Sequence, residues 1–281
     1  MSELHWVRTK RGEVCTQGAH VTRYWQVGGD DVLFLSRKSA FREGVPIRGG
    51  VPLVFPWFGN YPYGQDQDRR GRPSHGFARR VPWRVLENED LHGGSARVVL
   101  ELLSDEATLL MWPHRFRATM TVTFQDTLRL ELAVENRDTE AFRFEALLHT
   151  YLKVSDVRKC ALTGLEDSWC FDKTDGNALH REGTGPIRFD GEVDRTFCGS
   201  EAVCVLDDPV LRRTITVLKE NARSTVVWNP GAARAAELPD LGDAFPEFVC
   251  VESGNVMDDA ITLPPGERHV LAAVIESSPY R

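Results

Sequence analysis

Two histidines and one glutamate are the side chains of this sequence best suited to acid–base chemistry. His149 lies in the strand-like run ALLHTYL, Glu252 closes the apolar run FVCV, and His75 stands between a polar stretch and a glycine. A carboxylate is costly to bury unless it is paired or functional, so Glu252 is a candidate proton-transfer group. A lone strand histidine is more often structural than catalytic. None of these groups alone identifies a reaction.

Two arginines lie next to stretches rich in glycine and proline. Arg48 opens RGGVPLVFPWFG, and Arg79 closes HGFAR. Glycine lets the backbone turn sharply or approach a ligand closely, whereas each proline fixes φ and removes an amide donor. We therefore expect residues 47–59 to form a stiff, largely buried connection that holds Arg48 in a fixed place. The alternative is a structural crossing loop with a surface arginine.

Alternation of apolar and polar residues predicts the antiparallel sheet that must position these side chains. Residues 116–124, 128–135 and 142–151 each keep a period of two, which is typical of strands. In the third of these, the period places His149 on the face opposite the apolar set at 142–148. Further strands are expected at 32–35, 83–86, 97–103, 203–206, 212–218, 225–228, 248–252 and 270–275.

A short helix and polar loops complete the predicted organisation. Ser104 precedes Asp105 and Glu106, which predicts a helix with Ser104 as its N-cap and acidic residues in its first turn. Residues 28–31 carry a turn signal, and residues 60–74 read as a charged loop. Neither a repeat nor a low-complexity linker interrupts the pattern. We expect one all-β domain over residues 1–281, with two antiparallel sheets packed face to face.

Charge, hydropathy and cysteine spacing disfavour several functional classes. The net charge of −7 argues against nucleic acid or an anionic membrane as the main partner. No apolar run approaches the roughly 20 residues that span a bilayer, and the first residues lack a signal-peptide core. The six cysteines form neither a CxxC pair nor a zinc spacing. We expect no metal site and a cytoplasmic protein with reduced thiols.

Five motifs resemble, in this order, those of the hexose-6-phosphate mutarotases, the glucose-6-phosphate 1-epimerase branch of the aldose 1-epimerase group. They are IRGGVPLVFPWFG, SHGFARRVPW, LLHTYLKV, VVWNPG and FVCVESGNV. The resemblance implies a β-supersandwich of the galactose-mutarotase type with few short helices. It also implies interconversion of the α and β anomers of an aldohexose 6-phosphate, foremost glucose 6-phosphate, without a metal or organic cofactor.

The same resemblance implies roles for individual residues. Glu252 would take the proton of the C1 hydroxyl while His149 protonates the ring oxygen. His149 would then start protonated, which a nearby carboxylate favours. Ser74 stands where relatives often have glutamine, and Asp194 lies in GEVDR, which resembles the segment with the family's sugar-binding aspartate. The implied substrate-binding residues are Arg48, Ser74, His75, Arg79 and Asp194.

Other functions remain open on this sequence. A mutarotase of free hexoses such as galactose would keep His149 and Glu252 but would not need the arginine pair. A non-catalytic sugar-phosphate binding protein would need the binding groups but not the acid–base pair, and a purely structural sandwich would need neither. The expected partner is a small sugar phosphate, not nucleic acid or a membrane, and we expect a monomer.

Overall fold

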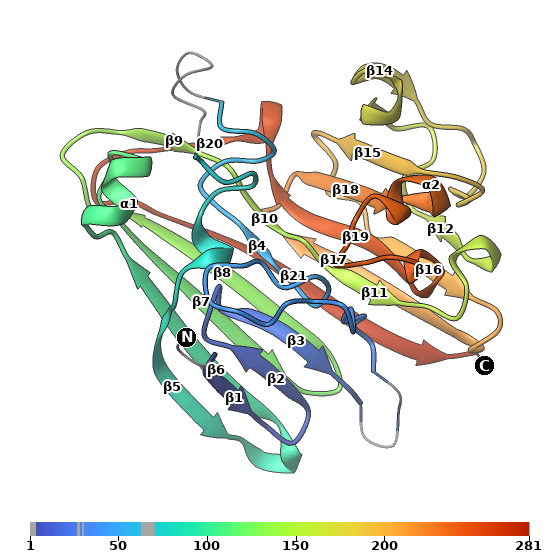
Figure 1. The fold of residues 1–281 in the computed structure, drawn as a ribbon, viewed down its shortest axis with the longest axis horizontal. Helices are drawn as coiled ribbons and strands as arrows, with labels where there is room; N and C mark the ends of the chain where they lie inside the picture. Colours follow the sequence, from blue (N-terminus) through green and yellow to red (C-terminus); the bar gives the residue numbers. More distant parts are fainter. Residues whose placement is uncertain (1–3, 27–28, 30, 63–70, 281) are drawn as a thin grey trace.

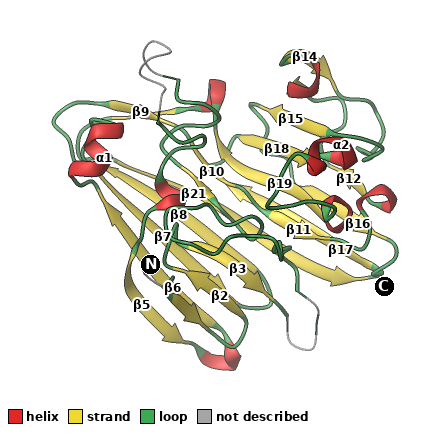
Figure 2. Cartoon of the chain, in the orientation of Figure 1, coloured by secondary structure: helices red, strands yellow, loops and turns green. Residues whose placement is uncertain are grey.

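The structure is a computed structural model that describes residues 4–26, 29, 31–62 and 71–280. Part of the turn predicted at 28–31 and most of the loop predicted at 60–74 lie outside the described residues. Strands dominate the described part, and the two α-helices and six 3-10 helices are short (Figure 2). The α-helices are α1 (Glu106–Met111) and α2 (Gly231–Ala236). The 3-10 helices are η1 (Ala78–Arg80), η2 (His92–Gly94), η3 (Val157–Lys159), η4 (Lys173–Asp175), η5 (Phe245–Glu247) and η6 (Met257–Asp259).

Two eight-stranded antiparallel sheets form the body of the molecule (Figure 1). The first, which we call the β8 sheet, has the order β12 (Ala161–Thr163), β16 (Cys204–Asp208), β17 (Arg213–Glu220), β21 (Arg268–Pro279), β8 (Leu128–Asn136), β7 (Phe116–Phe124), β6 (Ala96–Leu103) and β5 (Arg84–Asp90). The second, the β19 sheet, has the order β14 (Ala178–Arg181), β13 (Trp169–Asp172), β15 (Val193–Phe197), β18 (Ser224–Asn229), β19 (Phe248–Asn255), β10 (Ala146–Leu148) and β4 (Leu53–Val54), and β11 (Tyr151–Lys153) also pairs with β19.

Two smaller sheets accompany them. One consists of β1 (Trp6–Arg8), β2 (Gly12–Cys15) and β3 (His20–Tyr24), and the other of β9 (Phe142–Phe144) and β20 (Ile261–Leu263). The all-β, antiparallel fold class predicted from the period-two alternation is therefore confirmed. No helix within the described ranges has both the length and the apolar character to cross a membrane.

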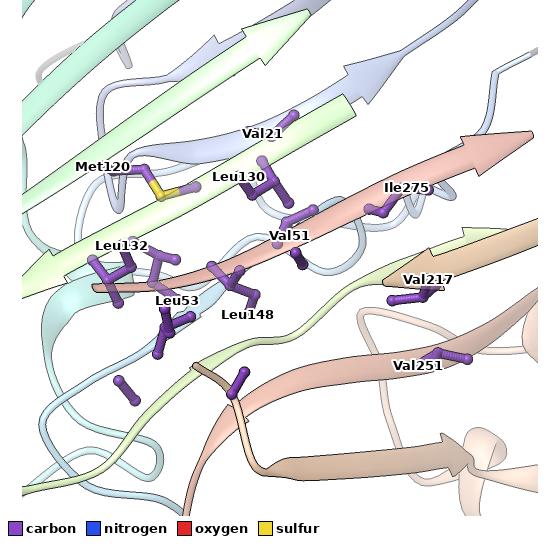
Figure 3. Packing of buried hydrophobic residues seen from close by; sticks show 14 of the residues in the cluster. Val21, Val51, Leu53, Met120, Leu130, Leu132, Leu148, Val217, Val251 and Ile275 are labelled. Atoms are coloured by element: carbon purple, nitrogen blue, oxygen red, sulfur yellow. The ribbon is translucent and has the colours of Figure 1, made fainter. Parts of the chain in front are cut away.

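Apolar side chains from both large sheets form one core (Figure 3). Met120 and Leu132 of the β8 sheet belong to the same buried cluster as Leu148 and Val251 of the β19 sheet. Along β7 every second residue is buried, as the alternation predicted. Along β19 all eight residues are buried, because its other face is covered as well. A polar side chain on β19 is thus withdrawn from solvent whichever way it points.

Several predicted elements differ from the observed ones. Residues 32–35 form isolated bridges at Leu33 and Leu35 in place of a strand. The single strand predicted at 142–151 is divided into β9, β10 and β11. The N-cap of α1 is Asp105, not Ser104, because its carboxylate accepts the Thr108 amide while the Thr108 hydroxyl accepts the Asp105 amide, each at 2.8 Å. Strands β12 to β15 were not predicted, since their short runs carry little alternation.

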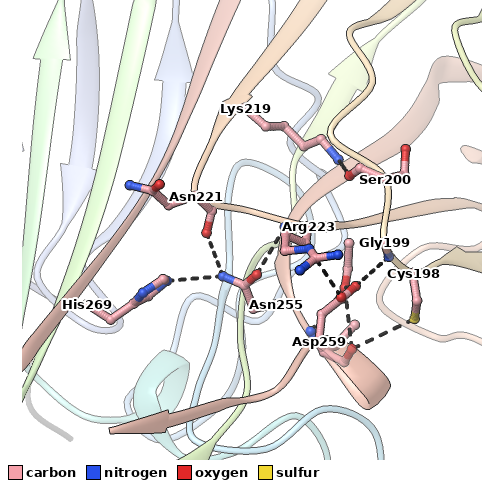
Figure 4. A network of polar contacts seen from close by, with 11 residues as sticks. Cys198, Gly199, Ser200, Lys219, Asn221, Arg223, Asn255, Asp259 and His269 are labelled. Atoms are coloured by element: carbon pink, nitrogen blue, oxygen red, sulfur yellow. Dashed lines mark hydrogen bonds and ion pairs between the residues drawn. The ribbon is translucent and has the colours of Figure 1, made fainter.

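A polar network anchors the C-terminal end of β19 (Figure 4). The Asn255 side chain accepts the Arg223 amide at 3.0 Å. The Asp259 carboxylate accepts the Gly199 amide and the Ser224 hydroxyl, both at 2.8 Å. These bonds tie the segment after β19 to the loops that flank β15 and β18. The strand that carries Glu252 is therefore held at a fixed position.

Candidate active site

The register of β19 places His149 directly opposite Glu252. Leu148 pairs with Ser253, and Tyr151 pairs with Cys250, so the residues between them face one another across the strands. The His149 Nδ1 atom lies 3.3 Å from Glu252 Oε1. His149 is 8% exposed and Glu252 1%. The predicted acid–base residues are thus adjacent and almost completely buried.

The glycine–proline connection at 47–52 supports the break between β10 and β11. The amide of His149 donates to the Pro52 carbonyl at 3.0 Å, and that of Tyr151 donates to the Gly50 carbonyl at 2.9 Å. Gly50 has a φ of +62°, and a Cβ there would lie 2.2 Å from the Val21 carbonyl oxygen. Only glycine fits this close approach. The predicted burial of this connection is therefore confirmed, and its two carbonyls fix the backbone at His149 and at Tyr151.

A cavity of about 430 Å³ adjoins the pair. All seven residues predicted for the site line it: Arg48, Ser74, His75, Arg79, His149, Asp194 and Glu252. Further lining residues were not predicted as site residues, among them Phe58, Tyr151, Lys173, Glu192, Trp228, Arg234 and Asp240. Tyr151 and Trp228 lie within the quoted motifs and could have been singled out. Lys173 and Asp240 lie outside those motifs, and no local pattern marks them.

Arg48 is held on two sides and is not a surface residue. Its Nε and Nη2 donate to the two Asp240 carboxylate oxygens at 3.0 and 3.2 Å, and its Nη1 donates to the Tyr151 hydroxyl at 3.1 Å. The Tyr151 ring stacks on the His149 imidazole, with ring centroids 4.8 Å apart and planes 7° from parallel. Arg48 therefore both lines the cavity and supports the tyrosine against which the histidine packs.

Arg79 differs from the other cations of the cavity. Its Nη2 donates to the Ser74 carbonyl at 2.9 Å, while its buried Nε has no hydrogen-bond partner among the described residues. Burial lowers the pKa of Arg79 to about 10. Arg48, Lys173 and Arg234 each form an ion pair with a carboxylate, but Arg79 has none within the described part of the chain. A half-buried cation without a charged partner is suited to receive an anion from the cavity.

His75 has a defined tautomer in its neutral form. The Gly59 amide donates to His75 Nδ1 at 3.2 Å, so the proton of the neutral ring is on Nε2. Burial, and then the charge of Arg79, lower the pKa of His75 well below its ordinary value. The His75 and His149 ring centroids are 6.2 Å apart. His75 thus offers a neutral N–H donor close to the acid–base pair.

Burial also governs the protonation of His149 and Glu252. Burial raises the pKa of the Glu252 carboxyl well above its ordinary value. Burial is the main cause that lowers the pKa of His149 well below its ordinary value, and the positive charge of Arg79 acts in the same direction. The expectation that His149 starts protonated is therefore wrong for the substrate-free protein. The desolvation of the imidazolium outweighs its attraction to the carboxylate, and a single proton shared by the pair is favoured on Glu252.

The aldose 1-epimerase family matches residues 10–276 of the chain. The chain belongs to this family. A relative from Salmonella typhimurium, named "Putative glucose-6-phosphate 1-epimerase", is 37% identical over 242 residues, which cover 84% of this chain and 77% of the relative. A crystal structure described as a "putative mutarotase (YeaD)", also from Salmonella typhimurium, superposes with a TM-score of 0.89 at 31% identity and covers 99% of this chain and 92% of that one.

The fold extends to more distant structures. A galactose mutarotase-like protein from Lactobacillus casei superposes on this chain with a TM-score of 0.75 at 18% identity, and covers 98% of this chain and all of that chain. At this identity the likeness concerns the fold alone. The predicted galactose-mutarotase type of fold is confirmed, and family membership identifies the protein as a sugar epimerase of the mutarotase kind.

Proposed function

We propose that this aldose 1-epimerase interconverts the α and β anomers of an aldohexose 6-phosphate, with glucose 6-phosphate as the preferred substrate. The observation that carries the proposal is the combination, in one cavity, of a buried His–Glu pair with Arg79, a half-buried cation that has no carboxylate partner among the described residues. A free hexose offers no charge to such a cation, whereas a 6-phosphate forms charge-assisted hydrogen bonds with it. The names of the relatives support the same substrate class.

The reaction needs one proton on the pair. When that proton moves from Glu252 to His149 across the 3.3 Å between Oε1 and Nδ1, the pair becomes a carboxylate base and an imidazolium acid. Glu252 then takes the proton of the C1 hydroxyl while His149 donates its proton to the ring oxygen, and the C1–O5 bond breaks. Rotation about C1–C2 presents the other face of the aldehyde. Ring closure reverses both proton transfers and yields the other anomer.

The charge of the substrate would itself favour the state in which His149 is protonated and Glu252 is a carboxylate. In the substrate-free protein the charge of Arg79 is one of the causes that lower the pKa of His149. A phosphate dianion bound at Arg79 would offset that charge and so raise the pKa of His149 toward its ordinary value. Arg48, His75, Ser74 and Asp194 line the same cavity and are the proposed contacts for the remainder of the sugar phosphate.

Anomer exchange measured by NMR tests this function. We expect the protein to accelerate exchange of glucose 6-phosphate far above the uncatalysed rate, and to act on free glucose and galactose much more weakly. Equal or faster exchange of a free hexose would instead make it a mutarotase of free sugars. Saturable binding of glucose 6-phosphate without any exchange would make it a sugar-phosphate binding protein.

A further inference from the structure

A thiol that the proposed proton transfer does not use lies beside the acid–base pair. Cys250 and Glu252 are separated by one residue on β19, and their side chains are on the same face of the strand. Cys250 Sγ, a ring nitrogen of His149 and a carboxylate oxygen of Glu252 all lie within 4.8 Å of one another. Three side chains of different chemistry thus converge at one buried point.

The polar atoms at this point are poorly satisfied. Among the residues that the structure describes, His149 Nδ1 and Glu252 Oε2 are buried without a hydrogen-bond partner. Cys250 is a free and completely buried thiol. Buried polar groups without partners are rare in folded proteins and mark places where a ligand or ion can be accommodated. An imidazole nitrogen, a thiolate sulfur and a carboxylate oxygen are all established zinc ligands.

We propose that His149, Cys250 and Glu252 form an inhibitory site for a thiophilic divalent cation, with Zn²⁺ as the foremost ligand. Ligand atoms on a tetrahedral zinc ion are about 3.3–3.8 Å apart, given the usual bond lengths. The three atoms therefore need only small side-chain movements, and a water molecule from the cavity would supply the fourth ligand. Binding releases the thiol proton to solvent. It also occupies the imidazole nitrogen and the carboxylate, so the pair can no longer exchange its proton.

The residues around the proposed site determine how tightly we expect it to bind a metal ion, and the ligand types determine which metal ions it prefers. Arg79 and Lys173 line the cavity together with His149 and Glu252. Their charges oppose a dication, so we expect micromolar affinity and not that of a structural zinc site. Cd²⁺ should bind similarly because it also prefers sulfur ligands. Mg²⁺ should not bind, because it requires oxygen ligands in octahedral geometry. The ligands come from two distant segments, so the absence of a zinc spacing in the sequence does not bear on this site.

Binding is tested without any measurement of activity. We would titrate Cd²⁺ into the full-length protein and follow the ultraviolet cadmium–thiolate absorbance of the wild type, Cys250→Ala and Cys204→Ala. Cys204 is the matched control, since it is equally buried but does not belong to the cluster. We expect Cys250→Ala to lose about one equivalent of the signal, and Cys204→Ala to retain it. Identical titrations of the wild type and Cys250→Ala would overturn the proposal. If Cys250→Ala does not fold, Cys250→Ser replaces it in the same titration.

Inhibition is the second test, and it rests on the proposed function. Micromolar Zn²⁺ should stop anomer exchange of glucose 6-phosphate, and EDTA should restore it fully, while EDTA alone should leave the activity unchanged. Cys250→Ala should keep wild-type turnover without zinc and raise the half-inhibitory zinc concentration by at least about tenfold, the order expected when a ligand is lost. An unchanged half-inhibitory concentration would contradict the proposal. If no sugar is turned over, the proposed function fails while the cadmium titration still decides the metal site.

Discussion

Glu101 of the β8 sheet and Glu252 of the β19 sheet are both strand glutamates with almost no exposed surface, at 5% and 1%. Glu101 accepts hydrogen bonds from Arg84 Nη2 at 2.5 Å and from Arg117 Nε at 2.6 Å. The bond from Arg84 is the main reason why the pKa of Glu101 lies below its ordinary value. Glu252 has no arginine at ion-pair distance among the described residues, and burial raises its pKa. The structure thus stabilises the charged form of Glu101 and destabilises the charged form of Glu252.

The difference follows from how the two sheets are covered. One face of the β8 sheet is open enough for long arginine side chains to lie across it and reach their partners from solvent, since the Arg84 side chain is 71% exposed. Both faces of β19 are buried, so Glu252 faces His149 and the cavity. An ionisable group that is buried where its charged form is poorly compensated is typical of sites of proton transfer. The comparison therefore separates a glutamate that supports the fold from one suited to catalysis.

The largest effect is expected from breaking the buried pair. Glu252→Gln and His149→Asn should each lower kcat for glucose 6-phosphate by about 100-fold or more, because each removes a general acid or base. The control is Glu101→Gln, which changes an equally buried strand glutamate outside the cavity and should leave kcat within about twofold, as for a site with no part in proton transfer. Near wild-type turnover by either cavity variant would remove that residue from the mechanism.

The next largest effect separates the two arginines of the cavity from an arginine of the β8 sheet. Arg79→Ala should raise KM for glucose 6-phosphate by about tenfold to a hundredfold, since a hydrogen bond to a charged group contributes about 1.5–3 kcal/mol. Any activity on free glucose should hardly change. Arg48→Ala should weaken sugar-phosphate binding too, and should also lower kcat because Arg48 supports Tyr151. Arg84→Ala is the control and should not alter KM. Equal losses on both sugars in Arg79→Ala would show that this arginine holds the ring or the fold.

A smaller effect concerns stability in the β8 sheet. Glu101→Gln should reduce the free energy of unfolding by about 1–2 kcal/mol at pH 7, a value below that of a fully buried charged pair because Arg84 is largely exposed. The pKa of Glu101 is lowered in the folded state, so its stabilisation is present above its ordinary pKa and is lost as pH falls through the folded value. Urea unfolding at pH 7 and pH 3 should show the variant approaching the wild type at the lower pH.

The smallest expected effect is a gain in stability, in contrast to the loss expected for Glu101→Gln. The pKa of Glu252 is raised in the folded state, so the wild type loses stability as pH rises above the ordinary value of the carboxyl. Glu252→Gln avoids this loss and should melt about 2 °C or more above the wild type at pH 8, with the difference vanishing near pH 4. Thermal unfolding across this pH range provides the measurement. A variant less stable than the wild type at pH 8 would mean that the glutamate is stabilised as a charge after all.

Much of the β8 sheet could be predicted from residue order because its strands alternate strictly. Strands β6, β7 and β8 were located to within about one residue at each end. The N-cap of α1 was harder to predict, because Ser104 and Asp105 are both good N-cap residues and only the position of Thr108 decides between them.

All seven predicted site residues line the cavity. Lys173 and Asp240 were missed, since the segments from which they reach the cavity carry no recognisable motif.

Residue order by itself determined which face of a strand each side chain occupies and which residues offer an acid, a base and a cation. Those properties are local, because a strand's period and a side chain's chemistry do not depend on distant segments. Only the tertiary structure decided that β10 and β11 pair with β19 in the register that sets His149 opposite Glu252. It also decided the protonation of the pair, because desolvation depends on everything packed around the two side chains. A histidine expected to be charged is neutral in the substrate-free protein for that reason.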